Sequence, residues 1–279
     1  MRRIFLGALF SILAATGFAP AAQACDAETP CDVAHGRYFV RAPAVWDGRS
    51  PLPVAVFFHG YKSSAKETMA DADLGAALSK AGVLLVAPDG LDGRWSAAPQ
   101  LSRGRDDIAF AREVVADVKK RFPVDPSLLV GTGFSAGGFM VWRIACEAGD
   151  LFSAYAPVAG AFLDPIPADC PTGPVSVRHI HGKADETVPM AGRWIGGGRI
   201  RQSDVGDSIA RMRALDGCAA EPLGKSVDGL DCQIWPAKAC ASGREIQLCL
   251  HADGHMMKGA WIADAFAWAR SLARASAQR

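Results

Sequence analysis

Short apolar segments recur along the chain, each bounded by Gly, Pro, Asp or His. Their length and nearly continuous hydrophobicity are typical of strands that are buried on both faces of a parallel sheet. These segments are residues 54–58, 83–87, 128–130, 154–158 and 175–180. Two weaker patterns, residues 37–45 and 245–250, are interpreted as an early and a late edge strand.

Helical periodicity occupies several of the stretches between these strands. From Asp106 to Phe122 apolar residues recur every three or four positions, and Pro123 follows the end of the pattern. The same spacing predicts helices over residues 135–148 and 261–272, and a weaker one over 204–215. Because strands and helices alternate, we predict an α/β fold with a mostly parallel, doubly wound sheet in a single domain.

The first residues have the pattern of an export signal. Arg2 and Arg3 precede an apolar run, and a small-x-small cleavage pattern ends at Ala24. A membrane anchor is the weaker interpretation, because Gly17 and Pro20 interrupt the run. We therefore predict a signal peptide over residues 1–24 and a secreted or periplasmic protein. Lipid attachment at the new N-terminus, Cys25, stays an open alternative.

Composition narrows the function classes. Half of the 279 residues are hydrophobic and the net charge is +1, with Lys and Arg scattered along the chain. This favours a large core, and it argues against nucleic acid as a partner and against stable membrane association. In an exported chain the eight cysteines predict disulfides, with Cys25 and Cys31 able to close a short loop. No cysteine or histidine pair has the spacing of zinc ligands, so we predict no metal.

The most informative motif is Gly133-Phe134-Ser135-Ala136-Gly137, which fits the Gly-x-Ser-x-Gly pattern. It lies between a predicted buried strand and a predicted helix, the context of a nucleophile elbow. Such a tight turn needs glycine at its flanks, because a Cβ there would strike the neighbouring elements. A Gly/Ser turn without chemistry is the alternative.

A nucleophilic serine needs a base and an acid that orients the base. Asp185 follows the predicted strand 175–180, at the end where open α/β sheets build their sites, and we predict it as the acid. His255 lies between the last strand and the last helix, and we predict it as the base. The other histidines after the serine, which we interpret as structural, are His179, His181 and His251.

Two further segments are expected to border the serine. His59-Gly60-Tyr61 ends the strand 54–58, and we predict that the backbone N–H groups of Tyr61 and Ala136 form the oxyanion hole while His59 organises the turn. Residues 187–203 contain three consecutive glycines and are either a surface loop or a substrate-side flap. Trp95 and Trp194 are candidate substrate contacts, with packing as the alternative.

Together these motifs resemble the secreted polyhydroxybutyrate-depolymerase-like esterases, a group of the α/β-hydrolase superfamily that includes feruloyl and acetylxylan esterases. The resemblance extends from about Arg37 to Trp268. Its specific blocks are VAVFFHG at 54–60, RDDIAF at 105–110, GTGFSAGG at 131–138, FSAYAPVAG at 152–160 and HGKAD at 181–185.

The resemblance implies the α/β-hydrolase fold and a catalytic triad of Ser135, Asp185 and His255. It also implies a disulfide between Cys146 and Cys170, and a structural helix start at Asp106 and Asp107. We expect an N-terminal segment over residues 25–36 and the catalytic domain over 37–275. Among the remaining cysteines, Cys218 is expected to pair with Cys232 or Cys240, a weak prediction.

The chain departs from the family beside the predicted base. Members of the family usually carry Gly-Gly-His-x-Trp-Pro, whereas this chain has Gly254-His255-Met256-Met257-Lys258. We expect Met256 and Met257 to contact the substrate in place of the missing aromatic residue.

The sequence thus predicts a secreted serine esterase that uses an acyl-enzyme and needs no cofactor. Its partner is a small or oligomeric ester: hydroxybutyrate oligomers or polymer, a feruloyl ester or an acetylated sugar. The alternatives are a serine peptidase of the same fold and a non-catalytic carbohydrate- or polymer-binding protein on a hydrolase scaffold. The sequence leaves the oligomeric state and the choice among these esters open.

Overall fold

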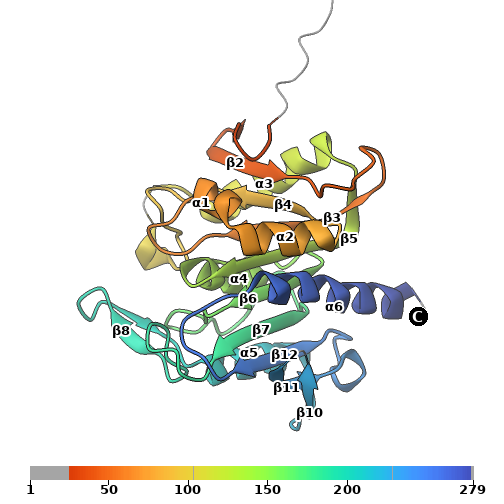
Figure 1. The fold of residues 1–279 in the computed structure, drawn as a ribbon. Helices are drawn as coiled ribbons and strands as arrows, with labels where there is room; N and C mark the ends of the chain where they lie inside the picture. Colours follow the sequence, from red (N-terminus) through yellow and green to blue (C-terminus); the bar gives the residue numbers. More distant parts are fainter. Residues whose placement is uncertain (1–24, 103, 228, 278–279) are drawn as a thin grey trace, which may run out of the picture.

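A ten-stranded sheet with helices on both faces forms the protein (Figure 1). The computed structural model describes residues 25–102, 104–227 and 229–277, so the predicted signal peptide lies outside the described residues. In spatial order the strands are β1 (Cys31–Val33), β2 (Gly36–Arg41), β4 (Leu84–Pro88), β3 (Leu52–Phe58), β5 (Val124–Phe134), β6 (Ala154–Val158), β7 (Val177–Gly182), β12 (Ile246–His251), β11 (Leu230–Trp235) and β10 (Leu223–Val227). The strands from β4 to β12 run parallel, and the outer strands at both ends pair antiparallel.

Two apolar clusters, one on each face, fix the layers. Alternate residues of β3 enter different clusters: Val54 and Val56 enter one, and Ala55 and Phe57 enter the other. The first cluster is covered by α3 (Asp107–Arg121), α4 (Ala136–Glu147) and α5 (Val205–Asp216), and the second by α1 (Ala65–Ala70), α2 (Ala72–Lys80) and α6 (Gly259–Ala277). Figure 1 shows α1, α2 and α6 in front of the sheet.

The edges of the sheet differ from the prediction. The strand predicted over 37–45 ends at Arg41, shortly before Pro43, and β1 covers its outer side. The strand predicted over 245–250 lies inside the sheet, because the β10–β11 hairpin pairs beside β12. The hairpin was not predicted: its first strand is mostly exposed and lacks the apolar run by which the parallel strands were recognised.

Helices α1 and α2 were not predicted, although each begins at a side-chain cap. Ser64 accepts a hydrogen bond from the backbone of Glu67, and Asp71 accepts one from Leu74. Their short length, six and nine residues, gave too little periodicity to separate them from a loop.

Four disulfides join the eight cysteines in the pairs Cys25–Cys31, Cys146–Cys170, Cys218–Cys240 and Cys232–Cys249. Cys232 and Cys249 face each other across β11 and β12, so their bridge ties the outer hairpin to the parallel core. Across the described ranges, no helix combines the length and hydrophobicity needed to cross a bilayer.

Candidate active site

Ser135 lies in the turn between β5 and α4, in a strained backbone conformation. Its φ is +56° and its ψ is −117°, a combination that residues other than glycine rarely adopt. A Cβ on Gly133 would lie 2.7 Å from the carbonyl oxygen of Phe58, and one on Gly137 would overlap the same atom. The close approach of β3 therefore requires glycine on both sides of the serine.

The structure brings Ser135 together with the predicted base and acid. Nε2 of His255 lies 2.9 Å from Oγ of Ser135, and Nδ1 lies 2.7 Å from Oδ2 of Asp185. The other carboxylate oxygen of Asp185 accepts hydrogen bonds from the backbone N–H groups of Thr187 (2.9 Å) and Val188 (2.8 Å). These bonds fix the carboxylate, which in turn orients the imidazole.

Behind this group, two buried histidines form a neutral chain. Nε2–H of His181 donates to the carbonyl of Val188 at 2.7 Å, so Nδ1 of His181 accepts from Nε2–H of His179 at 2.9 Å. Burial lowers the pKa of both imidazoles. His181 supports the loop that holds Asp185, and neither histidine contacts Ser135.

His59 holds the turn at the end of β3. Its Nε2 accepts from the backbone N–H of Gly90 at 2.9 Å, and its carbonyl accepts from the indole of Trp95 at 2.8 Å. Burial lowers the pKa of His59, which keeps the ring neutral and able to accept. A Cβ on Gly60 would lie 3.8 Å from Cβ of Ser135, so this turn runs beside the serine. Within the described part of the chain, the N–H groups of Tyr61 and Ala136 make no hydrogen bond.

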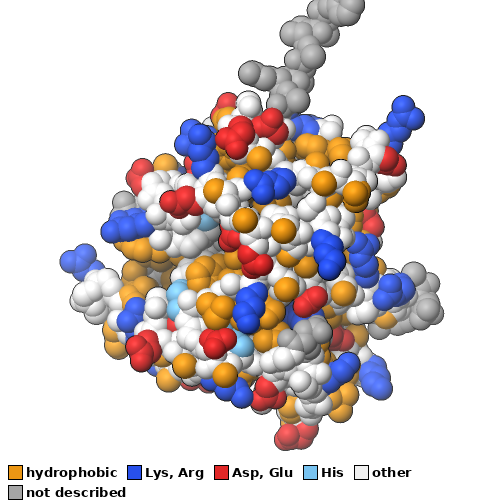
Figure 2. Space-filling view, in the orientation of Figure 1, with side chains coloured by type: hydrophobic (Ala, Val, Ile, Leu, Met, Phe, Trp, Pro, Cys, Tyr) orange, Lys and Arg blue, Asp and Glu red, His pale blue; other side chains and the backbone are white. Residues whose placement is uncertain are grey.

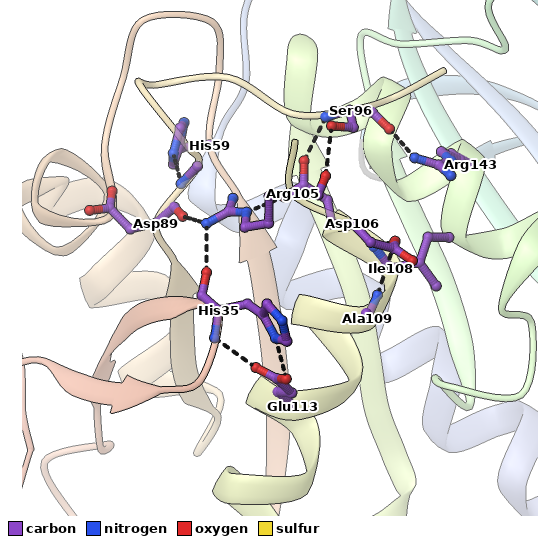
Figure 3. Close-up of polar contacts among 12 residues, drawn as sticks. His35, His59, Asp89, Ser96, Arg105, Asp106, Ile108, Ala109, Glu113 and Arg143 are labelled. Atoms are coloured by element: carbon purple, nitrogen blue, oxygen red, sulfur yellow. Dashed lines mark hydrogen bonds and ion pairs between the residues drawn. The ribbon is translucent and has the colours of Figure 1, made fainter. Parts of the chain in front are cut away.

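A buried ion pair anchors the loop that carries Trp95, and Figure 3 shows two contacts around it, Arg105 with Asp89 and Arg143 with Ser96. Nε of Arg105 lies 2.6 Å from Oδ1 of Asp107, and Oδ2 of Asp107 accepts from the backbone N–H of Ser96 at 2.6 Å. Arg105 also donates to the carbonyl of Asp89 at 3.1 Å, and Arg143 donates to the carbonyl of Ser96.

Asp106 caps helix α3 through the N–H groups of Ile108 and Ala109, in line with the predicted helix start. The role of Asp107 in the loop was missed. The signal in the sequence is Arg105, two residues before Asp107, but the fold decides which carboxylate Arg105 pairs with.

A cavity of about 600 Å³ opens beside Ser135. The segment predicted as a loop or flap forms one wall as a hairpin of β8 (Arg193–Ile195) and β9 (Ile200–Gln202). The η1 segment (Pro99–Leu101) contributes on another side. The lining residues are Tyr61, Arg94, Trp95, Ala97, Gln100, Leu101, Ser102, Ser135, Ala136, Phe139, Leu163, Thr187, Val188, Arg193, Ile195, Gly196, Ile200 and Gln202.

Trp95 lines this cavity, whereas three other predicted substrate contacts do not. Trp194 is 63% exposed, because alternation along β8 directs Arg193 and Ile195 inward and Trp194 outward. Met256 and Met257 pack against the apolar cluster under α6. Met256 and Met257 were expected in the pocket because they follow His255, and Trp194 because it lies in the predicted flap. Helix packing and strand alternation place these side chains outside the cavity lining.

No group of three or more His, Cys, Asp or Glu residues that could hold a metal ion occurs in the described ranges. The groups that the structure brings together at this site are a serine hydroxyl, an imidazole, a carboxylate and two backbone N–H groups without an acceptor among the described residues.

The chain is similar in sequence to proteins named as esterases. No protein-family model matches the chain. A putative esterase, NocK, from Nocardia uniformis subsp. tsuyamanensis is 39% identical over 155 residues, which cover 54% of this chain and 44% of that protein. Feruloyl esterase B from Piromyces equi is 24% identical over 230 residues, which cover 78% of this chain and 42% of that protein. The chain thus spans less than half the length of these two relatives.

Among solved structures, an acetyl xylan esterase from Aspergillus awamori aligns with a TM-score of 0.59 at 13% identity, covering 83% of this chain and 94% of that one. The chain has the α/β-hydrolase fold and is related to esterases. A fluorophosphonate-binding serine hydrolase of Staphylococcus aureus, FphF, also aligns, with a TM-score of 0.56 at 14% identity, covering 86% of this chain and 96% of that one. The predicted fold class is confirmed, and Ser135 lies in the turn between β5 and α4, the position at which this fold places a nucleophile elbow.

Proposed function

We propose that this α/β-hydrolase is a serine carboxylic-ester hydrolase. The observation that carries the proposal is the continuous contact from Ser135 through His255 to Asp185. Such a chain of contacts makes a serine hydroxyl nucleophilic at neutral pH.

In the proposed reaction, Oγ of Ser135 attacks the ester carbonyl while Nε2 of His255 takes the hydroxyl proton. The tetrahedral intermediate collapses to an acyl-serine when His255 returns that proton to the departing alcohol. A water molecule, deprotonated by His255, then attacks the acyl-serine and releases the acid. Asp185 stabilises the imidazolium that forms in each half-reaction.

The negative charge on the carbonyl oxygen needs donors that are already in place. The N–H groups of Tyr61 and Ala136 suit this role, because they border Ser135 and have no other acceptor among the described residues. Donors that need no reorganisation stabilise the transition state more than the ester ground state.

The substrate class and the location of the protein are also proposed. Relatives named esterase and feruloyl esterase favour an ester substrate, with hydroxybutyrate, feruloyl and acetyl-sugar esters as the candidates. The four disulfides favour an oxidising compartment, in line with the predicted signal peptide over residues 1–24.

The direct test is Ser135→Ala, with hydrolysis of p-nitrophenyl butyrate and covalent labelling by a fluorophosphonate as readouts. We expect kcat to fall at least about 10⁴-fold and labelling to disappear, because the nucleophile is gone. Ser226→Ala, at an exposed position on β10, is the matched control. We expect it to keep the wild-type rate of hydrolysis and the labelling.

Turnover that survives in Ser135→Ala would overturn the mechanism. A wild-type protein that neither hydrolyses esters nor reacts with the label would favour the binding-protein alternative. Cleavage of peptide amides in preference to esters would favour the peptidase alternative.

A further inference from the structure

The charged groups in the cavity beside Ser135 are of one sign. Arg94 and Arg193 line it, and no aspartate or glutamate belongs to its lining as far as the chain is described. Several other arginines, including Arg105, Arg112 and Arg201, form ion pairs with carboxylates. Arg94 and Arg193 form no ion pair within the described residues.

Arg94 is held in place by an aromatic ring. Its guanidinium carbon lies 4.9 Å from the ring centroid of Tyr61, the residue whose N–H is proposed for the oxyanion hole. Stacking on a ring leaves the N–H edges of a guanidinium available for an anion. Arg94 thus presents donors on the side of the cavity that Tyr61 forms.

Arg193 borders the cavity from the hairpin, as an exposed residue of β8. It pairs with Gln202 across β8 and β9, and Ile195 pairs with Ile200, and all four residues line the cavity. The intervening pair faces the other way, and there Arg201 binds Asp164 at 2.7 Å. Asp164 is therefore engaged by Arg201, and it does not line the cavity.

A buried amide beside Arg193 also lacks a partner. Gln202 is 5% exposed, and its Oε1 has no hydrogen bond among the described residues. This oxygen is an acceptor, so a donor such as a water or a ligand hydroxyl would satisfy it, and it takes no part in binding a carboxylate. Apolar residues form much of the remaining wall, including Trp95, Leu101 and Phe139.

We propose that the cavity selects esters that carry a free carboxylate, which Arg94 and Arg193 bind while Ser135 attacks the ester carbonyl. This inference rests on the proposed esterase function. Apolar surface between the arginines suits a short hydrocarbon chain that separates carboxylate and ester. Half-esters of dicarboxylic acids and oligomers of hydroxy acids have this chemistry, whereas neutral alkyl esters lack the anion. Figure 2 shows basic side chains over the hairpin and over the nearby η1 segment on the same side of the molecule.

Two pairs of esters test the proposal and locate the anion. Monomethyl adipate and methyl hexanoate differ by a carboxylate on the acyl side; 6-acetoxyhexanoate and hexyl acetate differ by one on the alcohol side. Acid release, followed by titration near neutral pH and at low salt, gives kcat/KM for each. We expect the charged member of at least one pair to be preferred by about tenfold, the contribution of one charge-assisted hydrogen bond.

Arg94→Gln and Arg193→Gln are the decisive variants, each read as the ratio of kcat/KM for charged over neutral ester. At least one is expected to lower the ratio about tenfold, and added salt is expected to lower it in the wild type. Arg199→Gln is the matched control, because Arg199 lies on the same hairpin but does not line the cavity. We expect this variant to have the same ratio of kcat/KM values as the wild type.

Ratios near one in the wild type, or ratios that neither arginine variant changes, would overturn the selection of anions and leave the esterase proposal standing. A protein that hydrolyses neither member of any pair nor p-nitrophenyl butyrate would overturn both.

Discussion

At the scale of single residues, the site depends on the glycines beside Ser135 as much as on the residues that react. Ser135 keeps its strained backbone only because β3 and α4 approach the turn closely from two sides. The Gly-x-Ser-x-Gly pattern made this predictable from sequence, since the need for glycine is local and steric. Which atoms enforce it, chiefly the carbonyl of Phe58, depends on the order of strands in the sheet.

Gly137→Ala tests this steric limit. A methyl group there would overlap the carbonyl of Phe58, so β3 or α4 must shift, and we expect stability to fall by about 3 kcal/mol or more. Gly224→Ala is the control, because nothing lies within 4 Å of its added Cβ, and a change below about 1 kcal/mol is expected. Urea unfolding of both variants measures the difference, and equal effects would contradict the argument.

At the scale of elements, strand alternation decides which residues of a segment reach the cavity. The glycine-rich segment was recognised in the sequence as a loop or flap, but its pairing was not, because each of its strands has only three residues. Once β8 and β9 pair, the inward positions of Arg193 and Gln202 and the outward position of Trp194 follow from the two-residue period.

Asp107→Asn tests whether the start of α3 supports the loop of Trp95. The variant leaves the buried Arg105 without a carboxylate, and we expect a loss of about 3 kcal/mol in unfolding free energy together with a lower kcat/KM. Asp150→Asn breaks the exposed pair with Arg112 and is expected to cost less than about 1 kcal/mol without an effect on activity. A comparable loss of stability in the two variants would refute the anchoring role.

At the scale of the whole molecule, the site and the buried Asp216 lie at opposite ends of the strands of the sheet. The triad and its cavity lie at the carboxyl ends of β5, β7 and β12. A second cavity of about 510 Å³, lined by residues that include Ser153, Val175 and Ser176, lies at the opposite ends of β6 and β7. Asp216, at the end of α5, is buried on this far side of the fold.

Asp216 predicts how stability depends on pH. Burial raises its pKa from 3.8 to about 7, and the Val175 backbone and the Arg244 charge oppose this only in part. The folded state therefore binds this proton more tightly than the unfolded state. The contribution of Asp216 to stability is fully present below pH 3.8 and is lost as the pH rises through about 7.

Asp216→Asn cannot ionise, so the stability of the variant relative to the wild type should rise between about pH 5 and about pH 8. Urea unfolding at the two pH values measures this difference, in which the other titrating groups cancel. A difference that is independent of pH, or that falls, would show that Asp216 is ionised in the folded protein throughout.

The sequence by itself determined the features that local chemistry encodes. Continuous apolar runs predicted the buried parallel strands, and the three- to four-residue period predicted α3, α4 and α6. The glycines that a tight turn requires predicted the elbow at Ser135. The order of residues along the chain predicted Asp185 as the acid and His255 as the base, because the loops that follow parallel strands lie at the same edge of the sheet.

Only the tertiary structure decided which side chains surround the serine. The directions of Met256 and Met257 and the backbone partner of Asp107 depend on contacts between separate segments of the chain, and the direction of Trp194 depends on the pairing of β8 with β9. Sequence patterns report the burial of a residue through its own period. They do not report which residues contact a given side chain, because those contacts depend on how separate elements pack against each other.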